Sequence, residues 1–94
     1  MRIVWRRRAL IDLNGIEAFI ENDNPAAARA MEQRIKEAVS LLAVHPGMGR
    51  PGRVPNTREL IVADTPYIVA YMILRDHIEI LTVLHSAREW PDAL

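Results

Sequence analysis

The stretch ELIVADTPYIVAYMILRDHIEILTVLH, residues 59–85, decides the fold. It contains three runs rich in β-branched and aromatic residues, at 59–64, 67–75 and 78–85, and such runs are typical of strands. The links between the runs are only a Thr-Pro turn and a tight reversal near Asp76. Links this short join antiparallel neighbours, so the stretch predicts a three-stranded antiparallel meander.

The residues at the start of the chain predict a strand followed by a helix. The run RIVW at 2–5 is short, β-branched and aromatic, as in a brief strand. An amphipathic helix is expected from Ala9 to the sequence ENDNP at 21–25, because apolar residues recur there at helical spacing. These residues are Leu13, Ile16 and Ile20. Gly15 inside this helix costs about 1 kcal/mol relative to alanine, so we expect another backbone to pack closely against it.

A second helix is predicted to follow the first at once. Asn24 is suited to cap it through its side-chain oxygen, and Pro25 fits the first turn, where a missing N–H does no harm. Apolar residues repeat at helical spacing up to about His45, which precedes a proline. They are Ala28, Met31, Ile35, Ala38 and Leu42. The two helices therefore form a hairpin.

The order of these elements predicts the fold class and the domain organisation. Ninety-four residues suit one compact domain and leave no room for a second core. We predict a single domain over residues 1–94 of the α+β class. An N-terminal strand and a two-helix antiparallel hairpin would pack on a mainly antiparallel four-stranded sheet.

Composition narrows the possible cofactors and the location. The chain has no cysteine, and its three histidines lack the spacing of a dedicated metal site, so we expect no metal and no cofactor. The apolar runs are too short and too interrupted to span a bilayer. We expect a cytoplasmic protein with no membrane partner. Twelve basic and twelve acidic residues give a net charge of zero.

The loop at 46–58 carries three arginines and no acid. Arg50, Arg53 and Arg58 permit three interpretations: contact with phosphates, docking to an acidic protein surface, or a solvated loop with an internal ion pair such as Arg58 with Glu59. Arg58 begins a strand, which favours the internal role for it. The glycines around Arg50 and Arg53 leave the backbone free to adapt to a partner.

The run from Tyr67 to Leu74 is apolar at nearly every position, so both of its faces require cover. Two helices shield only one face of a sheet. The other face is either open to a partner, covered by the tail around Trp90, or paired with a second copy. The residues expected on it are Ile68, Ala70, Met72 and Leu74.

Five segments, in this order, resemble the RelE/ParE superfamily of bacterial toxins of type II toxin–antitoxin systems. They are ALIDLNGIEAFIENDNPAAA, HPGMGRPGR, TRELIV, PYIVAYMI and ILTVLHSAREWP, and they cover nearly the whole chain. The resemblance implies a helical hairpin packed on a sheet and a cognate antitoxin that lies over the apolar surface of the toxin. RelE-like members cleave messenger RNA on the ribosome, whereas ParE-like members poison DNA gyrase.

Three positions depart from the RelE-like nucleases and favour the ParE-like members. Those nucleases carry an arginine after the first tyrosine of the Y-x-x-x-Y strand, a basic residue after the last strand, and often a tyrosine near the C-terminus. Here Ile68 follows Tyr67, Ser86 follows His85, and residues 86–94 contain no tyrosine. We therefore predict a gyrase inhibitor without catalysis of its own.

The site residues follow from these interpretations. We predict that the target is contacted by Arg50, Arg53, Arg88 and Trp90, and that the antitoxin is bound by Ile68, Ala70, Met72 and Leu74. Trp90 is either an anchor for the tail or a contact for a partner. In the alternative hypothesis, a RelE-like ribosome-dependent mRNA interferase, the endoribonuclease site uses His85, Arg88 and Arg58, with Arg50 and Arg53 beside them. A third hypothesis is a non-toxic binding module. The expected partners are the antitoxin, in a hetero-oligomer, and gyrase, or the ribosome and mRNA in the alternative.

Overall fold

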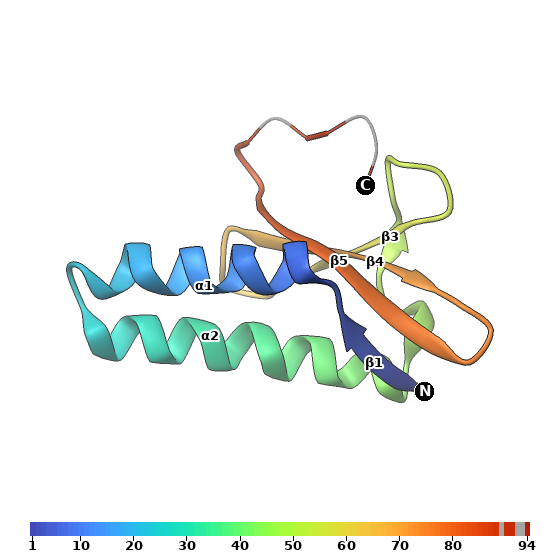
Figure 1. Cartoon of the computed structure of the whole chain (residues 1–94), viewed down its shortest axis with the longest axis horizontal. Coiled ribbons are helices and arrows are strands. Elements are labelled where there is room, and N and C mark those ends of the chain that lie inside the picture. Colours follow the sequence, from blue (N-terminus) through green and yellow to red (C-terminus); the bar gives the residue numbers. More distant parts are fainter. Residues whose placement is uncertain (89, 92–93) are drawn as a thin grey trace.

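The computed structural model describes residues 1–88, 90–91 and 94. The elements in chain order are β1 (Arg2–Trp5), α1 (Arg7–Glu21), α2 (Pro25–Ser40), the 3-10 turns η1 (Leu41–Ala43) and η2 (Pro46–Met48), β2 (Arg50–Pro51), β3 (Arg58–Ile61), β4 (Tyr67–Ile73) and β5 (His77–His85). The helices lie on one side of the sheet, and residues 86–88 and 90–91 after β5 lie on the other side (Figure 1). The predicted α+β arrangement is confirmed.

The sheet has the strand order β1-β5-β4-β3-β2. The predicted meander is confirmed, since β3, β4 and β5 pair antiparallel with their neighbours. The N-terminal strand β1 pairs parallel with β5, placing Arg2 opposite His77. The sheet has five strands rather than the predicted four, because Arg50 and Pro51 of the basic loop pair with β3 as β2.

Two boundaries of the helices differ from the prediction. Helix α1 begins at Arg7 rather than Ala9, because the chain leaves the sheet at Arg6, whose amide donates to the Ile80 carbonyl over 2.9 Å. The cap of α2 is confirmed, since the Asn24 side chain accepts from the Ala27 amide over 3.1 Å. Helix α2 ends at Ser40, and the 3-10 turn η1 continues its path.

A bulge in β5 aligns the core. Ala70 of β4 lies opposite Thr82, but the next residue, Tyr71, lies opposite Ile80, so Leu81 is an extra residue in β5. The bulge turns both Ile80 and Val83 toward the helices, although they are three positions apart. Both join the core between helices and sheet. This core also contains Leu13, Ile35, Val39, Leu42, Val69 and Tyr71.

Gly15 does not pack against another backbone, so the expectation of a close approach there is wrong. A Cβ built at Gly15 would have no other atom within 4 Å, leaving aside its chain neighbours and the backbone of its own helical turns. The residue is exposed in the middle of α1. Its cost to the helix is therefore not offset by contacts with the described residues.

No helix among the described residues has the length and apolarity that crossing a bilayer requires. No three His, Cys, Asp or Glu side chains gather within residues 1–88, 90–91 and 94 in a way that could hold a metal ion.

Candidate functional site

Glu59 organises two of the three arginines of the basic loop. Its side chain, on β3, is only 2% exposed. Its carboxylate accepts from Nη2 of Arg50 over 3.0 Å, and from the backbone N–H and Nε of Arg53 over 2.9 and 3.2 Å. Burial alone would raise the pKa of Glu59. The hydrogen bonds from the Arg53 amide, from the Arg53 side chain and from Arg50 outweigh that effect, and the net result is a lowered pKa.

The third arginine binds the loop backbone instead. The Arg58 guanidinium donates from Nε and Nη2 to the Gly49 carbonyl over 2.9 and 2.6 Å, and from Nη2 to the Gly47 carbonyl over 3.2 Å. The internal role expected for Arg58 is confirmed, but its expected pairing with Glu59 is wrong. Adjacent residues of a strand point to opposite faces, so these two side chains cannot meet.

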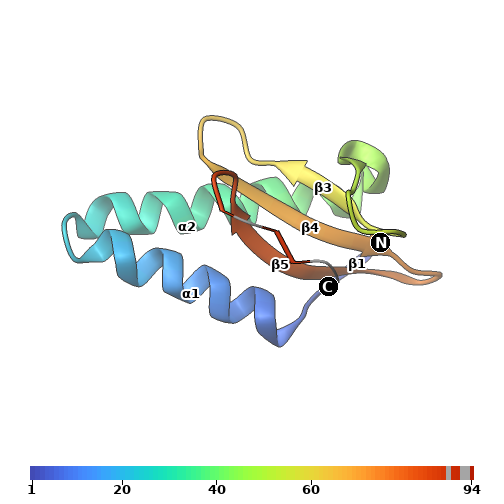
Figure 2. The same cartoon turned by 90° about the horizontal axis from the view of Figure 1, so that it is seen from above.

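Trp90 lies against this cluster. The Arg53 guanidinium stands over the Trp90 ring, 3.8 Å from its centroid, in cation–π geometry. Seen from above, residues 86–88 and 90–91, which follow β5, lie in front of β4 and β5 (Figure 2). The ring is half-buried, and within the described part of the chain its Nε1 is buried without a hydrogen-bond partner. The interpretation of Trp90 as an anchor for the tail is confirmed.

The sheet face expected to be open is largely covered. Ile68 and Ala70 are 5% and 0% exposed, while Met72 and Leu74 are half-buried. The expectation of an open apolar strip is therefore wrong for Ile68 and Ala70, because the C-terminal segment lies over this face of the sheet. Their contact with an antitoxin stays a prediction.

His85 and Arg58 lie at different ends of the sheet. His85 is opposite Tyr67 and Arg58 is opposite Tyr71, which places them roughly 13 Å apart along β4 at about 3.3 Å per residue. The His85 ring meets that of Tyr67 edge-on, with 5.6 Å between centroids, and Nδ1 of His85 accepts from the Ala87 amide over 3.1 Å. The structure does not bring the residues of the nuclease hypothesis together.

A groove lies beside α1, at the end of the sheet that carries His85. It has a volume of about 710 Å³. Its lining comes from α1, from the adjoining ends of β4 and β5, and from the first residues after β5: Ile11, Asp12, Gly15, Ile16, Phe19, Tyr67, Val83, His85, Ala87 and Arg88. We call it the α1 groove. Sequence reasoning missed it, although Gly15 between Ile11 and Phe19 at four-residue spacing was a signal.

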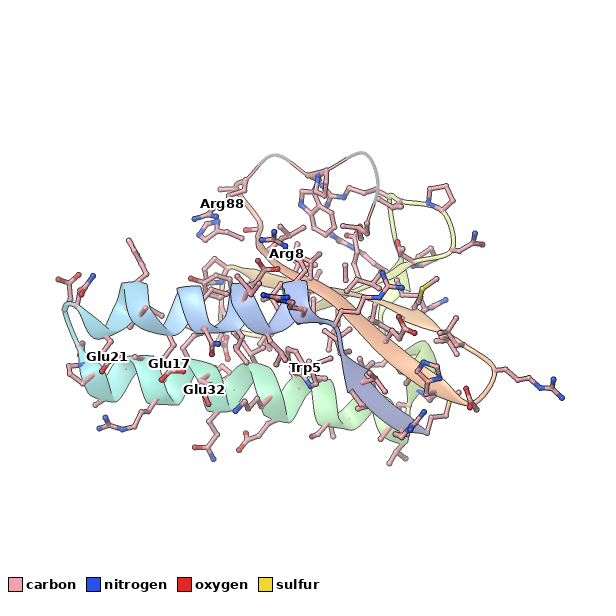
Figure 3. The ribbon with its side chains drawn as sticks, viewed as in Figure 1. Trp5, Arg8, Glu17, Glu21, Glu32 and Arg88 are labelled. Atoms are coloured by element: carbon pink, nitrogen blue, oxygen red, sulfur yellow. The ribbon has the colours of Figure 1, made fainter. Side chains whose placement is uncertain are left out.

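Asp12, the acidic residue of the α1 groove, already has hydrogen-bond partners within the chain. Asp12 accepts from the Thr82 hydroxyl over 2.5 Å and from the Val83 amide over 3.1 Å. The other carboxylate oxygen lies 3.7 Å from Nη1 of Arg8. Arg8 and Arg88 both lie along the upper side of α1 in Figure 3. Among the residues that line the groove, Arg88 is the exposed cation, whereas Arg8 is paired with Asp12.

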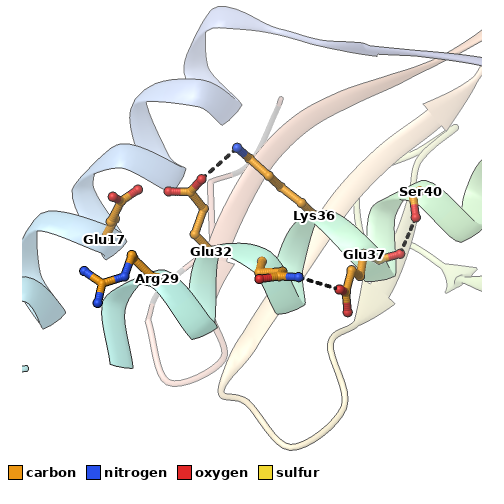
Figure 4. A pocket seen from close by; sticks show the side chains of 7 residues that line it. Glu17, Arg29, Glu32, Lys36, Glu37 and Ser40 are labelled. Atoms are coloured by element: carbon orange, nitrogen blue, oxygen red, sulfur yellow. Dashed lines mark hydrogen bonds and ion pairs between the residues drawn. The ribbon is translucent and has the colours of Figure 1, made fainter. Parts of the chain in front are cut away.

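Another hollow, on the outer surface of the helical hairpin, is lined by charged and polar side chains, several of which pair with one another. Lys36 donates to Glu32 over 2.7 Å, and the Gln33 amide donates to Glu37 over 3.0 Å. These side chains lie along α2 with Glu17 of α1 opposite them (Figure 4). Paired charges of this kind at the i and i+4 positions are typical of a solvated helix surface. We assign no binding role to this hollow.

A further charged cluster links Arg6, which follows β1, to the hairpin between β4 and β5. Nδ1 of His77 lies 2.7 Å from Asp76, Nε2 lies 3.0 Å from Glu79, and Glu79 accepts from Nε of Arg6 over 2.6 Å. The hydrogen bonds to Asp76 and then Glu79 raise the pKa of His77. The hydrogen bonds from His77 lower the pKa of Asp76 and of Glu79, and Arg6 adds to the effect on Glu79.

Comparison with known proteins gives likenesses over nearly the whole chain. A family model described as "ParE toxin of type II toxin-antitoxin system, parDE" matches residues 3–90. The chain is 53% identical over 93 residues to "Putative toxin Y4kP" of Sinorhizobium fredii, covering 99% of this chain and 96% of that protein. It is 37% identical over 87 residues to "Toxin RelE2" of Caulobacter vibrioides, covering 93% and 97%. A solved structure described as "Chromosomal ParDE TA system from P. aeruginosa" matches with a TM-score of 0.83 at 30% identity, covering 90% of this chain and 95% of that one.

Proposed function

This chain belongs to the ParE toxin family of type II toxin–antitoxin systems, and we propose that it inhibits DNA gyrase and thereby arrests growth until a cognate antitoxin neutralises it. A toxin with this function would act in the cytoplasm. It would form a hetero-oligomer with its antitoxin. The family match over residues 3–90 is the observation that carries the proposal.

The positions of the candidate nuclease residues support a mechanism without catalysis. Cleavage of RNA through its 2′-hydroxyl needs a base, an acid and cations around one phosphate. Here Arg58 is committed to the carbonyls of Gly47 and Gly49, and it lies at the other end of the sheet from His85. His85 and Arg88 alone would have to supply all three roles.

The target surface in this proposal consists of Arg50 and Arg53, which bind Glu59, together with Arg88 and Trp90 after β5. Arg50 and Arg53 hold the buried carboxylate, yet their side chains are still 50% and 48% exposed. The outer faces of both guanidinium groups, together with exposed Arg88, would meet an acidic surface of gyrase. Trp90 would support the guanidinium of Arg53 from beneath.

The predicted antitoxin contacts divide into two classes. Met72 and Leu74 are half-buried, and an antitoxin would reach them without rearrangement. Contact with Ile68 or Ala70 requires the C-terminal segment over this face to move, because both side chains are buried.

Purified toxin tests the two modes of action side by side. We expect it to inhibit supercoiling by gyrase and to leave messenger RNA on translating ribosomes uncut. Arg88→Glu should weaken inhibition, whereas the same charge reversal at Arg75, on the hairpin beyond β4, should not. Shortened transcripts together with fully active gyrase would establish the mRNA interferase instead.

A further inference from the structure

Strand β3 has a free edge beyond the short strand β2. Strand β2 pairs only with Arg58 and Glu59, and no other strand of the described residues lies on that side of β3. The Val62 amide donates to the Tyr67 carbonyl over 3.1 Å, so the backbone of Val62 points toward β4. Successive residues of an antiparallel strand point their backbone groups to alternate sides, so the N–H and C=O of Ile61 point to the free edge. Such an edge is a template for pairing with another chain.

An apolar hollow borders this free edge. It has a volume of about 410 Å³ and lies between β3, the last turn of α2 and the turns η1 and η2. Ile61, Leu41 and Met48 line it, and they are 54%, 52% and 43% exposed. Single exposed apolar side chains are ordinary, but three that gather beside an unpaired strand edge indicate a contact surface. We call these three side chains, with the edge at Ile61, the β3 edge surface.

The charges at the two ends of the β3 edge surface have opposite signs. Arg50 lies at the end near Glu59, and its side chain is 50% exposed although it binds that carboxylate. Asp64 lies at the other end, and its side chain is 87% exposed, 3.6 Å from Arg34. Two β3 strands that pair antiparallel about Ile61 place each end of one copy against the opposite end of the other. Asp64 of each copy then faces Arg50 of the other.

These features fit a second copy of the chain better than a partner of a single charge. Two residues that face each other in a hydrogen-bonded antiparallel pair exchange both N–H···O bonds, and a two-fold axis at Ile61 provides this for identical strands. A strongly acidic or basic partner would meet a like charge at one end, whereas the two-fold arrangement pairs both ends. The chain has twelve basic and twelve acidic residues, so no net charge opposes self-association.

We propose that two copies of the toxin associate through the β3 edge surface as a two-fold dimer, in which Ile61 pairs with Ile61 of the second copy and both hollows are buried. Strand β2 already occupies the edge at Glu59, so the strand pairing is short and side chains supply most of the contact. A contact of this kind gives a reversible dimer rather than an obligate one. The α1 groove shares no lining residue with this hollow and stays open in the dimer.

Sedimentation equilibrium of the purified chain tests the dimer. We expect a monomer–dimer equilibrium with a Kd in the micromolar range. Ile61→Lys should raise the Kd at least about tenfold, because it places two like charges at the two-fold axis. Ile73→Lys, at a 41% exposed position of β4 outside the hollow, is the control and should associate normally. Met48→Lys lies in a turn rather than in the sheet, so it repeats the test without altering a strand, and it should also weaken association.

Hydrogen exchange tests the strand pairing itself. The Ile61 amide should exchange more slowly as the protein concentration rises, because it donates a hydrogen bond across the interface only in the dimer. The Val62 amide donates within the chain and is the internal control, with a protection that should not change with concentration.

Asp64 tests the charges. Asp64→Asn should raise the Kd about twofold to fivefold, because asparagine accepts the positive φ of 63° at this position but lacks the charge. Asp23→Asn makes the same change at the exposed turn between the helices and should leave the Kd unaltered.

These measurements use neither antitoxin nor gyrase, so their outcome is separate from that of the proposed function. A chain that stays monomeric at every soluble concentration would overturn the proposal. Equal Kd values for Ile61→Lys and Ile73→Lys, or exchange of the Ile61 amide that does not depend on concentration, would also overturn the assignment to the β3 edge surface.

Discussion

Single side chains fasten the basic loop to the sheet. Tyr71 is fully buried, and its hydroxyl donates to the Pro46 carbonyl over 2.7 Å and accepts from the Gly49 amide over 2.9 Å. Gly49 cannot be larger, because an added Cβ would lie 2.7 Å from the Tyr71 ring. The hydroxyl therefore positions the backbone whose carbonyls bind Arg58.

Tyr71→Phe should destabilise the toxin by about 1–3 kcal/mol, since the buried Gly49 amide loses its acceptor. Urea unfolding measures the difference. Tyr67→Phe is the matched control, because the Tyr67 hydroxyl makes no hydrogen bond within the described residues, and its cost should stay within ~0.5 kcal/mol. Equal losses in the two variants would contradict the role given to the Tyr71 hydroxyl.

At the scale of single residues, the sequence predicted the internal role of Arg58 and the anchoring by Trp90. The predicted ion pair between Arg58 and Glu59 was wrong. Strand alternation alone excludes the pairing of Arg58 with Glu59, and that rule could have corrected the assignment. The partners found, Arg50 and Arg53, depend on the path of a glycine-rich loop. No periodicity encodes such a path.

At the scale of elements, α1 completes the edge of β5 where β1 ends. Strand β1 pairs with β5 only as far as Ile80. Beyond that point Asp12 of α1 accepts from the Val83 amide and the Thr82 hydroxyl, so a side chain replaces the missing strand. This contact also fixes α1 against the end of β5 that forms the α1 groove.

Asp12→Ala should destabilise the fold by about 1–3 kcal/mol, because it leaves the Val83 amide without an acceptor. Hydrogen exchange should show faster exchange of that amide than in the wild type, with Ile80 still protected. Asp23→Ala, at the exposed turn between the helices, is the control and should change neither value. Unchanged protection of Val83 in Asp12→Ala would contradict the proposed edge contact.

Element type was predictable where apolar periodicity extends over several residues, as in both helices and in β3, β4 and β5. It failed for β2, because two residues show no period. The bulge at Leu81 was equally invisible, since an inserted residue leaves the run of β-branched residues unbroken. At Gly15 the sequence signalled a place beside the helix for another element, but it did not say whether an element of the same chain fills that place.

At the scale of the whole molecule, the His77 cluster links the chain near its beginning to the β4–β5 hairpin. The pKa of His77 is raised above its ordinary 6.5, so its contribution to stability is complete below that pH and disappears as pH rises through the raised value. The lowered pKa values of Asp76 and Glu79 keep their contribution until pH falls below their ordinary 3.8 and 4.5. The cluster therefore stabilises most between about pH 4.5 and pH 6.5.

His77→Gln should remove the alkaline part of this dependence. Between about pH 6 and about pH 9, the Tm of the wild-type toxin should fall toward that of the variant, and the gap between them should narrow steadily. Calorimetric scans at constant ionic strength measure it. A gap that widens with rising pH would show that the sign assigned to His77 is wrong.

The tail is the other long-range contact of the molecule. Trp90→Ala should lower the Tm and increase binding of the dye ANS, because the ring no longer covers the sheet beside Arg53. Trp5→Phe, which keeps an aromatic ring at the helix side of the sheet, should bind no extra dye. An unaltered dye signal in Trp90→Ala would exclude a covering role for the ring.

The parallel pairing of Arg2 with His77 also limits how far the protein can fold during its synthesis on the ribosome. Strand β1 has no neighbour in the sheet until β5 has been synthesised, and closing so long a stretch of chain is slow. A nascent chain thus holds β1 unpaired until residues 77–80 have left the ribosome. Since α1 and the end of β5 must also come together, the α1 groove forms only after β5 has been synthesised.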